Sequence, residues 1–164
     1  MSMYSSAKTG WYKMINADKF IVPTVESQSV MKSYKIINGE ITVNYRSSLE
    51  LACLRYCDYN KHIVKFSLEP FAIQYLKPTD GKMHRYFVDF YIEFSTGDRF
   101  LVEIKSSGET VAPNIPKKKT QKAVFNYNNA LQTFAVNTAK WDAAKKFAVQ
   151  QKMKFIILTE NELK

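Results

Sequence analysis

One stretch of the sequence, residues 85–105, constrains the fold more than any other. Two runs rich in aromatic and β-branched residues, Arg85–Phe94 and Asp98–Lys105, flank the tripeptide Ser95-Thr96-Gly97. A three-residue turn with glycine in the left-handed conformation is a common connection in a β-hairpin. This turn would pair Asp89 with Glu103 and Glu93 with Arg99. The sequence therefore predicts a hairpin with two acids opposite each other.

Side chains alternate along the two predicted strands and separate an apolar face from a polar one. The apolar face would hold Val88, Phe90, Ile92, Phe94, Phe100, Val102 and Ile104, and the polar face Asp89, Glu93, Arg99, Glu103 and Lys105. The cross-strand pair of Glu93 and Arg99 has opposite charges, which independently favours this register. We expect the apolar face in the core and the chemistry on the other face.

The polar face combines the residue types that hydrolyse phosphodiester bonds with a divalent cation. Asp89 and Glu103, as cross-strand neighbours, would have Cβ atoms about 5 Å apart. Mg²⁺ takes oxygen ligands and retains several waters, so two or three carboxylates and a backbone carbonyl, such as that of Ile104, suffice. Lys105 on the same face would orient the attacking water or stabilise the phosphoryl charge. A Glu-x-Lys pair alone also occurs in ordinary amphipathic strands, so the prediction depends on the hairpin register.

The charge of the chain indicates a polyanionic partner. Its 24 Lys and Arg exceed its 15 Asp and Glu, which gives a net charge of +9 and a pI near 9.4. Residues 105–164 hold eleven Lys and four acids, a net +7. Double-stranded DNA fits this excess, whereas no apolar run approaches the roughly 20 residues of a membrane span. The predicted DNA contacts are Arg85, Lys117, Lys118, Lys119 and Lys122, although the Lys117–Lys119 run could equally be a solvated loop.

The rest of the sequence predicts one α/β domain preceded by an arm. Residues 1–44 show no sustained hydrophobic period and predict an N-terminal arm that packs on another surface. Ser47-Ser48-Leu49-Glu50 predicts a capping box, with Glu50 bonded to the Ser47 backbone N–H, that opens a helix to about Tyr59. Strands are expected at residues 64–68, 71–76 and 155–158, and helices at 120–133 and 138–152. The fold class is therefore a mixed sheet flanked by helices, within a domain of residues 45–164.

With Asp89, Glu103-x-Lys105 and the upstream Glu50, the chain resembles the PD-(D/E)XK superfamily, with Val88 in place of the proline of that name. The resemblance sharpens toward the head-completion nucleases of tailed bacteriophages, which are themselves similar to the TnsA-type endonuclease of transposons. It covers roughly residues 44–162. The residues that carry it are Tyr45-Arg46-Ser47, Glu50, Arg85–Asp89, Glu103–Lys105, Glu109-Thr110, Pro113, Pro116, Val136–Thr138, Lys140-Trp141, Lys154-Phe155 and Ile157–Glu160.

The resemblance implies a restriction-endonuclease-like αβββαβ core. It implies that Glu50, Asp89, Glu103 and Lys105 are catalytic, with Mg²⁺ or Mn²⁺ held by the three acids and the Ile104 carbonyl. From the residues alone, Glu50 could instead serve only the capping box. Glu69 stands before Pro70 where the transposon relatives often carry Gln-Pro, so an additional acid either approaches the site or faces solvent.

The resemblance also implies a phage protein that processes the end of packaged DNA before the tail attaches. We expect head, portal or neck proteins to bind the arm, and no membrane. The protein would act in the host cytoplasm and could remain in the virion head. Two other functions stay open: a structural head or neck adaptor that plugs the DNA end, and a transposase-like enzyme that cuts one strand with a partner protein.

Overall fold

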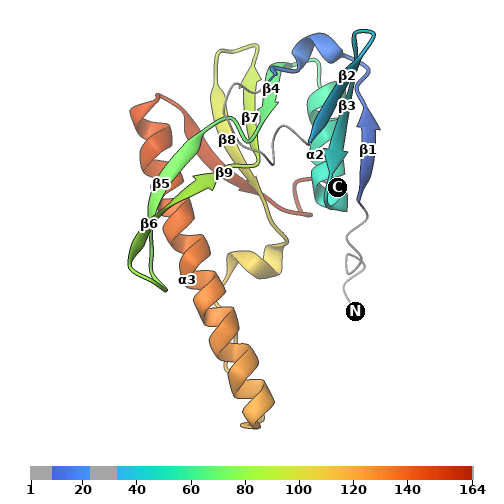
Figure 1. Cartoon of the computed structure of the whole chain (residues 1–164). Coiled ribbons are helices and arrows are strands. Elements are labelled where there is room, and N and C mark those ends of the chain that lie inside the picture. Colours follow the sequence, from blue (N-terminus) through green and yellow to red (C-terminus); the bar gives the residue numbers. More distant parts are fainter. Residues whose placement is uncertain (1–8, 23–32, 164) are drawn as a thin grey trace.

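A four-stranded mixed sheet lies between two helices in the computed structural model, which describes residues 9–22 and 33–163 (Figure 1). The strand order is β4 (Ile63–Leu68), β7 (Phe90–Phe94), β8 (Arg99–Ile104) and β9 (Lys154–Leu158). β4, β7 and β8 pair antiparallel, and β9 runs parallel to β8. With α2 (Ser48–Tyr59) and α3 (Gln121–Gln150), the succession α2, β4, β7, β8, α3, β9 confirms the predicted αβββαβ core.

The predicted hairpin register is confirmed for the residues of β7 and β8, whereas Asp89 lies just before β7 and its predicted pairing with Glu103 is not part of the strand ladder. Phe90 pairs with Val102 and Glu93 with Arg99, and Gly97 takes a φ of 90° in the turn. The first strand, however, does not continue back to Arg85. The residues before Val88 form a different strand, β6 (Lys82–Phe87), which pairs with β5 (Ala72–Lys77) in a separate two-stranded sheet. The chain passes from that sheet to the main sheet at Val88 and Asp89.

Both faces of the main sheet are covered, which corrects the prediction of one apolar and one open polar face. Phe90, Ile92, Val102 and Ile104 pack with residues of α2 in one core. Val88 and Leu101 pack with Ala144 and Ala148 of α3 in a second core on the opposite face. Val88 lies with the second core because it falls in the break between β6 and β7, and the alternation of β7 does not extend across that break.

Residues 121–150 form one continuous helix, which corrects the prediction of two. The segment around Val136-Asn137 contains no glycine or proline, and the Thr138 hydroxyl donates to the Phe134 carbonyl at 2.8 Å within the helix. Weak helix formers alone do not interrupt a helix that tertiary contacts support. A short 3₁₀ helix, η2 (Ser107–Thr110), lies in the connection before α3. None of the helices in the described residues is long and apolar enough to cross a membrane.

The described part of residues 1–44 contains regular structure that the hydrophobic period did not indicate. β1 (Gly10–Lys13), β2 (Tyr34–Ile37) and β3 (Glu40–Tyr45) form an antiparallel sheet with β3 in the middle, and η1 (Ala17–Lys19) follows β1. Asn38 and Gly39 both have positive φ, at 52° and 79°, in the β2–β3 turn. Asn-Gly is the strongest short signal for such a hairpin, and it was present in the sequence. The rest of the predicted arm, residues 1–8 and 23–32, lies outside the described residues.

Asp58, in the last turn of α2, joins this N-terminal sheet to the domain. Its buried carboxylate accepts hydrogen bonds from the Tyr12 hydroxyl at 2.6 Å and from the backbone N–H groups of Ile15 and Asn16 at 2.9 and 2.8 Å. Burial alone would raise the pKa of Asp58, but these donors outweigh it and lower the pKa below its ordinary value. The ionised form is therefore the one that the fold stabilises.

We expect Asp58→Asn to destabilise the protein by about 2 kcal/mol at pH 7, because an amide cannot accept from all of these donors. The folded-state pKa lies below the unfolded value, so this stabilisation is present above about pH 4 and is lost as the pH falls through the folded-state pKa. Urea unfolding of both proteins across this range should show the difference shrinking in acid. Asp18→Asn, at an exposed position in η1, is the matched control. A difference that does not change with pH would mean that Asp58 is not ionised in the native state.

Candidate active site

Asp89 lies at the break between β6 and β7, where the chain passes from one sheet to the other. Its Oδ2 accepts a hydrogen bond from the Ile104 backbone N–H at 2.8 Å. Its carbonyl accepts one from the Glu69 N–H at 3.0 Å. Because both bonds use rigid backbone groups, the Asp89 carboxylate is fixed against the end of β8.

Glu103 lies on β8 one residue before Ile104 and is 5% exposed. One of its oxygens accepts a hydrogen bond from the Tyr86 hydroxyl of β6. The other oxygen, Oε1, is 3.8 Å from the Lys105 Nζ. The structure therefore brings Asp89, Glu103 and Lys105 together at the end of β8.

The electrostatics of this cluster favour a bound cation. Burial raises the pKa of Asp89 well above its ordinary value, and the charge of Glu103 raises it further, against the Ile104 N–H and the charge of Lys105. Burial also raises the pKa of Glu103, although the Tyr86 hydroxyl and Lys105 oppose this shift. Positive charge relieves a carboxylate whose pKa is raised by burial and by a neighbouring carboxylate.

Glu50, in the first turn of α2, has a capping role and also borders the cluster. Its Oε2 accepts from the Arg46 backbone N–H at 2.7 Å, and its own N–H donates to the Ser47 hydroxyl at 3.1 Å. The prediction that Glu50 bonds to the Ser47 N–H is therefore wrong by one residue, because the observed donor is the N–H of Arg46. The negative charge of Glu50 contributes to raising the pKa of Asp89. A cavity of about 20 Å³, enough for roughly one water or ion, is lined by Glu50 and Asp89 together.

Glu69 approaches the site, which decides between the two placements that the sequence left open. Its side chain is 11% exposed, lines the same cavity and accepts from the Arg46 guanidinium at 2.8 Å. That hydrogen bond, with the charges of Glu50 and Asp89, raises the pKa of Arg46. The Glu69 backbone has a φ of 42°, a left-handed conformation that costs about 1 kcal/mol outside glycine and is common at functional sites. A third acid and its arginine partner thus border Asp89.

Lys140 of α3 is a neighbour of the cluster whose role sequence reasoning did not assign. Its Nζ lies 5.8 Å from the Tyr75 ring centre and 5.6 Å from that of Tyr86. Burial lowers the pKa of Lys140, while the charge of Glu103 opposes that shift. The Lys140-Trp141 pair marked this position only as part of the family resemblance. No local sequence pattern relates Lys140 to Tyr86 of β6 or Glu103 of β8, because these residues are far apart in the sequence.

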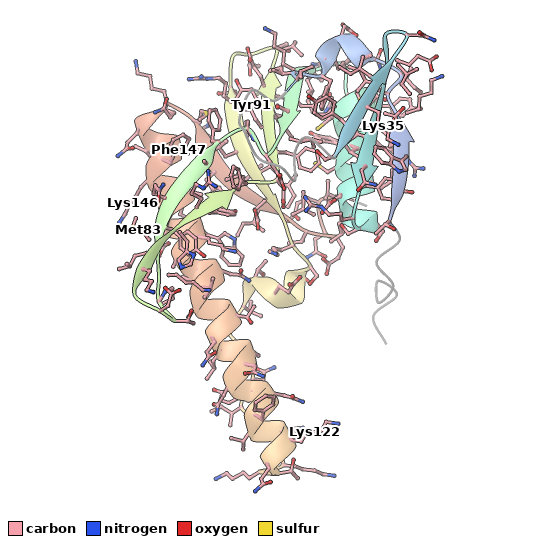
Figure 2. The ribbon with its side chains drawn as sticks, in the orientation of Figure 1. Lys35, Met83, Tyr91, Lys122, Lys146 and Phe147 are labelled. Carbon is pink, nitrogen blue, oxygen red and sulfur yellow. The ribbon has the colours of Figure 1, made fainter. Side chains whose placement is uncertain are left out.

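The predicted DNA contacts do not converge on the acids. Arg85 is exposed and stacks on Phe87, with its guanidinium carbon 5.8 Å from the ring centre. Alternation along β6 directs Arg85 away from the face of Tyr86. Lys117, Lys118 and Lys119 are exposed and immediately precede α3, and Lys122 lies near the end of α3 that projects from the domain (Figure 2). These lysines therefore form a basic region that is separate from the acids.

Carboxylate oxygens are the ligands that Mg²⁺ and Mn²⁺ take, so the donor chemistry of Asp89 and Glu103 fits such an ion. Within residues 9–22 and 33–163, no three His, Cys, Asp or Glu side chains are arranged as a ready-made metal site. Glu50 bonds to Arg46, Asp89 to Ile104 and Glu103 to Tyr86. The predicted ligand set of Glu50, Asp89, Glu103 and the Ile104 carbonyl thus stays a prediction.

Comparison with known proteins places this geometry in a family. Residues 60–160, more than half of the chain, match the family described as TnsA-like endonuclease N terminal, and this segment holds Asp89, Glu103, Lys105 and Lys140. The chain is also 37% identical over 122 residues to a protein of Enterobacteria phage T4 named head completion nuclease. That alignment covers 74% of this chain and 81% of the phage T4 protein. The chain therefore belongs to the TnsA-like endonuclease family.

Proposed function

We propose that this protein is a divalent-metal-dependent DNA endonuclease whose active site is Asp89, Glu103 and Lys105, with Glu50 at its border. The observation that carries the proposal is the convergence of a buried carboxylate (Glu103), a half-buried one (Asp89) and a lysine at the end of β8. Burying such acids without a function is costly. Membership of an endonuclease family and the net charge of +9 support DNA as the substrate.

Each side chain has a separate part in this proposal. Mg²⁺ or Mn²⁺, when bound by Asp89 and Glu103, supplies an activated water and neutralises charge that develops on the phosphoryl oxygens. Tyr86 fixes the rotamer of Glu103 through its hydroxyl. Lys105, with a side chain 26% exposed, can reach solvent and stabilise the phosphoryl group or orient the water.

We further propose that the protein processes the end of packaged phage DNA before the tail attaches. The phage T4 relative, named for head completion, supports this role. Residues 1–44 would then bind head, portal or neck proteins, in the host cytoplasm or in the assembled head. Exposed apolar side chains on β1 and β2 support such docking, since Trp11, Ile36 and Ile37 are 43%, 50% and 64% exposed.

The same exposed strands leave a structural adaptor or DNA-end plug as a second candidate. An adaptor would need the surface of β1 and β2 but not the carboxylates of Asp89 and Glu103. Substitutions at these acids therefore separate the two functions, because only the endonuclease depends on them.

Asp89→Ala and Lys105→Ala should each reduce cleavage of linear duplex DNA by about a hundredfold or more in Mg²⁺ or Mn²⁺. Asp98→Ala, in the exposed β7–β8 turn, should retain activity. Thermal unfolding of each variant checks that the fold is intact. Equal activity in all of these proteins, or no activity in any of them with either metal, would remove the proposal.

Glu50→Gln separates the capping role of Glu50 from a role in the site. The glutamine carbonyl can still accept from the Arg46 N–H, so thermal stability should be close to wild type. Loss of the charge beside Asp89 should reduce cleavage by about tenfold or more if Glu50 helps to hold a metal. Glu50→Ala should lose both stability and cleavage. Full activity in Glu50→Gln would assign Glu50 to the helix cap alone.

Replacing Lys117, Lys118 and Lys119 together with Gln tests whether this run binds DNA. For each of these lysines that contacts a phosphate, the log–log slope of affinity against salt should decrease in magnitude by about 0.9. The matched control replaces Lys61, Lys145 and Lys146, which are also exposed, and removes the same charge. If the two triple variants have the same slope, the run has no special contact with DNA.

A further inference from the structure

The first half of α3 projects away from the main sheet (Figure 1). The residues that α3 contributes to the second core begin at Val136, and none of its residues belongs to the first core. Phe125 is 64% exposed and Val124 is 40% exposed. An isolated helix as long as the first half of α3 is only marginally stable in water. Its projection therefore needs an explanation other than the core.

The sequence around the projection is basic and contains no acid. Between Val111 and Trp141 there are five Lys and no Asp or Glu, a charge of +5 out of the total of +9. A helix that is merely solvated usually mixes acids with bases. The absence of acids in this part of the sequence favours an anionic partner.

A row of exposed or half-buried polar residues follows one face of α3, and we call it the α3 stripe. They succeed one another at intervals of three or four residues, the spacing of one helix face. The α3 stripe consists of Lys122, Asn126, Asn129, Thr133, Asn137 and Lys140. At 1.5 Å per residue it is about 27 Å long, roughly eight base-pair steps of a DNA duplex.

The inner part of the α3 stripe lines a groove of about 380 Å³ that faces the β5–β6 turn. Thr79 of that turn forms one side, and α3 forms the other. The α3 residues are Asn129, Gln132, Thr133, Val136, Asn137 and Lys140. Apart from Val136, the side chains that line the groove are amides, hydroxyls and one ammonium. These are groups that donate hydrogen bonds to phosphate oxygens.

The groove leads from the helix surface toward the acids. Lys140, at its inner end, lies 5.6 Å from the ring centre of Tyr86, whose hydroxyl donates to Glu103. A phosphate bound by Lys140 would therefore be close to the cluster at the end of β8. The opposite end of the α3 stripe leads to Lys122 and the Lys117–Lys119 run.

We propose that the α3 stripe and its groove bind the sugar–phosphate backbone of duplex DNA, with Lys140 as the phosphate-binding residue nearest to the acids. This inference rests on the proposed endonuclease function and assigns the surface that positions the substrate. Donors that contact only the backbone carry no direct sequence information, so this surface holds DNA of any sequence.

Neighbouring asparagines of α3 provide a matched test. Asn129 lines the groove, whereas Asn128 is exposed about 100° away around the helix axis. Asn129→Asp and Asn128→Asp add the same charge to the same helix. Binding of a fluorescein-labelled blunt duplex is measured by anisotropy in EDTA, where no cleavage occurs. Asn129→Asp should weaken binding about tenfold, and Asn128→Asp by no more than about twofold.

Lys140→Gln, with Lys145→Gln as its control, tests the inner end of the groove. Only Lys140→Gln should reduce the salt slope, by about 0.9. If the two Asn variants bind equally and the two Lys variants have equal slopes, the α3 stripe is not the DNA surface, even while the wild type cleaves duplex in Mg²⁺. If the wild type neither binds nor cleaves duplex DNA, both this inference and the proposed endonuclease function fail.

Discussion

The hydrogen bond from the Ile104 N–H to the Asp89 carboxylate joins the two parts of the structure on which the site depends. At Asp89 the chain leaves the β5–β6 sheet and enters the main sheet, and at Ile104 strand β8 ends. The bond holds the carboxylate beside Glu103 and Lys105 without using either of them. The position of the Asp89 carboxylate in the proposed active site is thus set by backbone geometry.

Burial disfavours the ionised forms of Asp89 and Glu103, and neighbouring side chains offset this cost in different ways. Burial raises the pKa of both Asp89 and Glu103. Tyr86 and Lys105 counter the shift at Glu103, and Arg46 pairs with Glu69 on the other side of Asp89. Acids held in this way destabilise the folded chain when no cation is present, which is typical of sites that are optimised for chemistry.

Much of the fold and the centre of the site could be predicted from local sequence. Gly97 fixed the hairpin register, and Ser47 and Glu50 marked the start of α2, because turns and caps depend on a few neighbouring residues. The break at Val88 could not be read from alternation, since Arg85–Phe94 is apolar enough for one long strand. The single helix α3 depends on packing against β5, β8 and β9 that local propensity does not encode. The approach of Glu69 and Lys140 to the acids depends on tertiary contacts between distant segments.

Helix α2 carries Glu50 in its first turn and Asp58 in its last, about 12 Å apart along the axis. The first residue borders the acids, and the second anchors the N-terminal strands. A helix of this length is stiff, so a tilt of about 5° at the Asp58 end would displace Glu50 by about 1 Å, enough to matter in a catalytic geometry. If the proposed active site is correct, substitutions in β1 or β3 will alter cleavage without contacting the acids, because the N-terminal strands help to hold α2 in place.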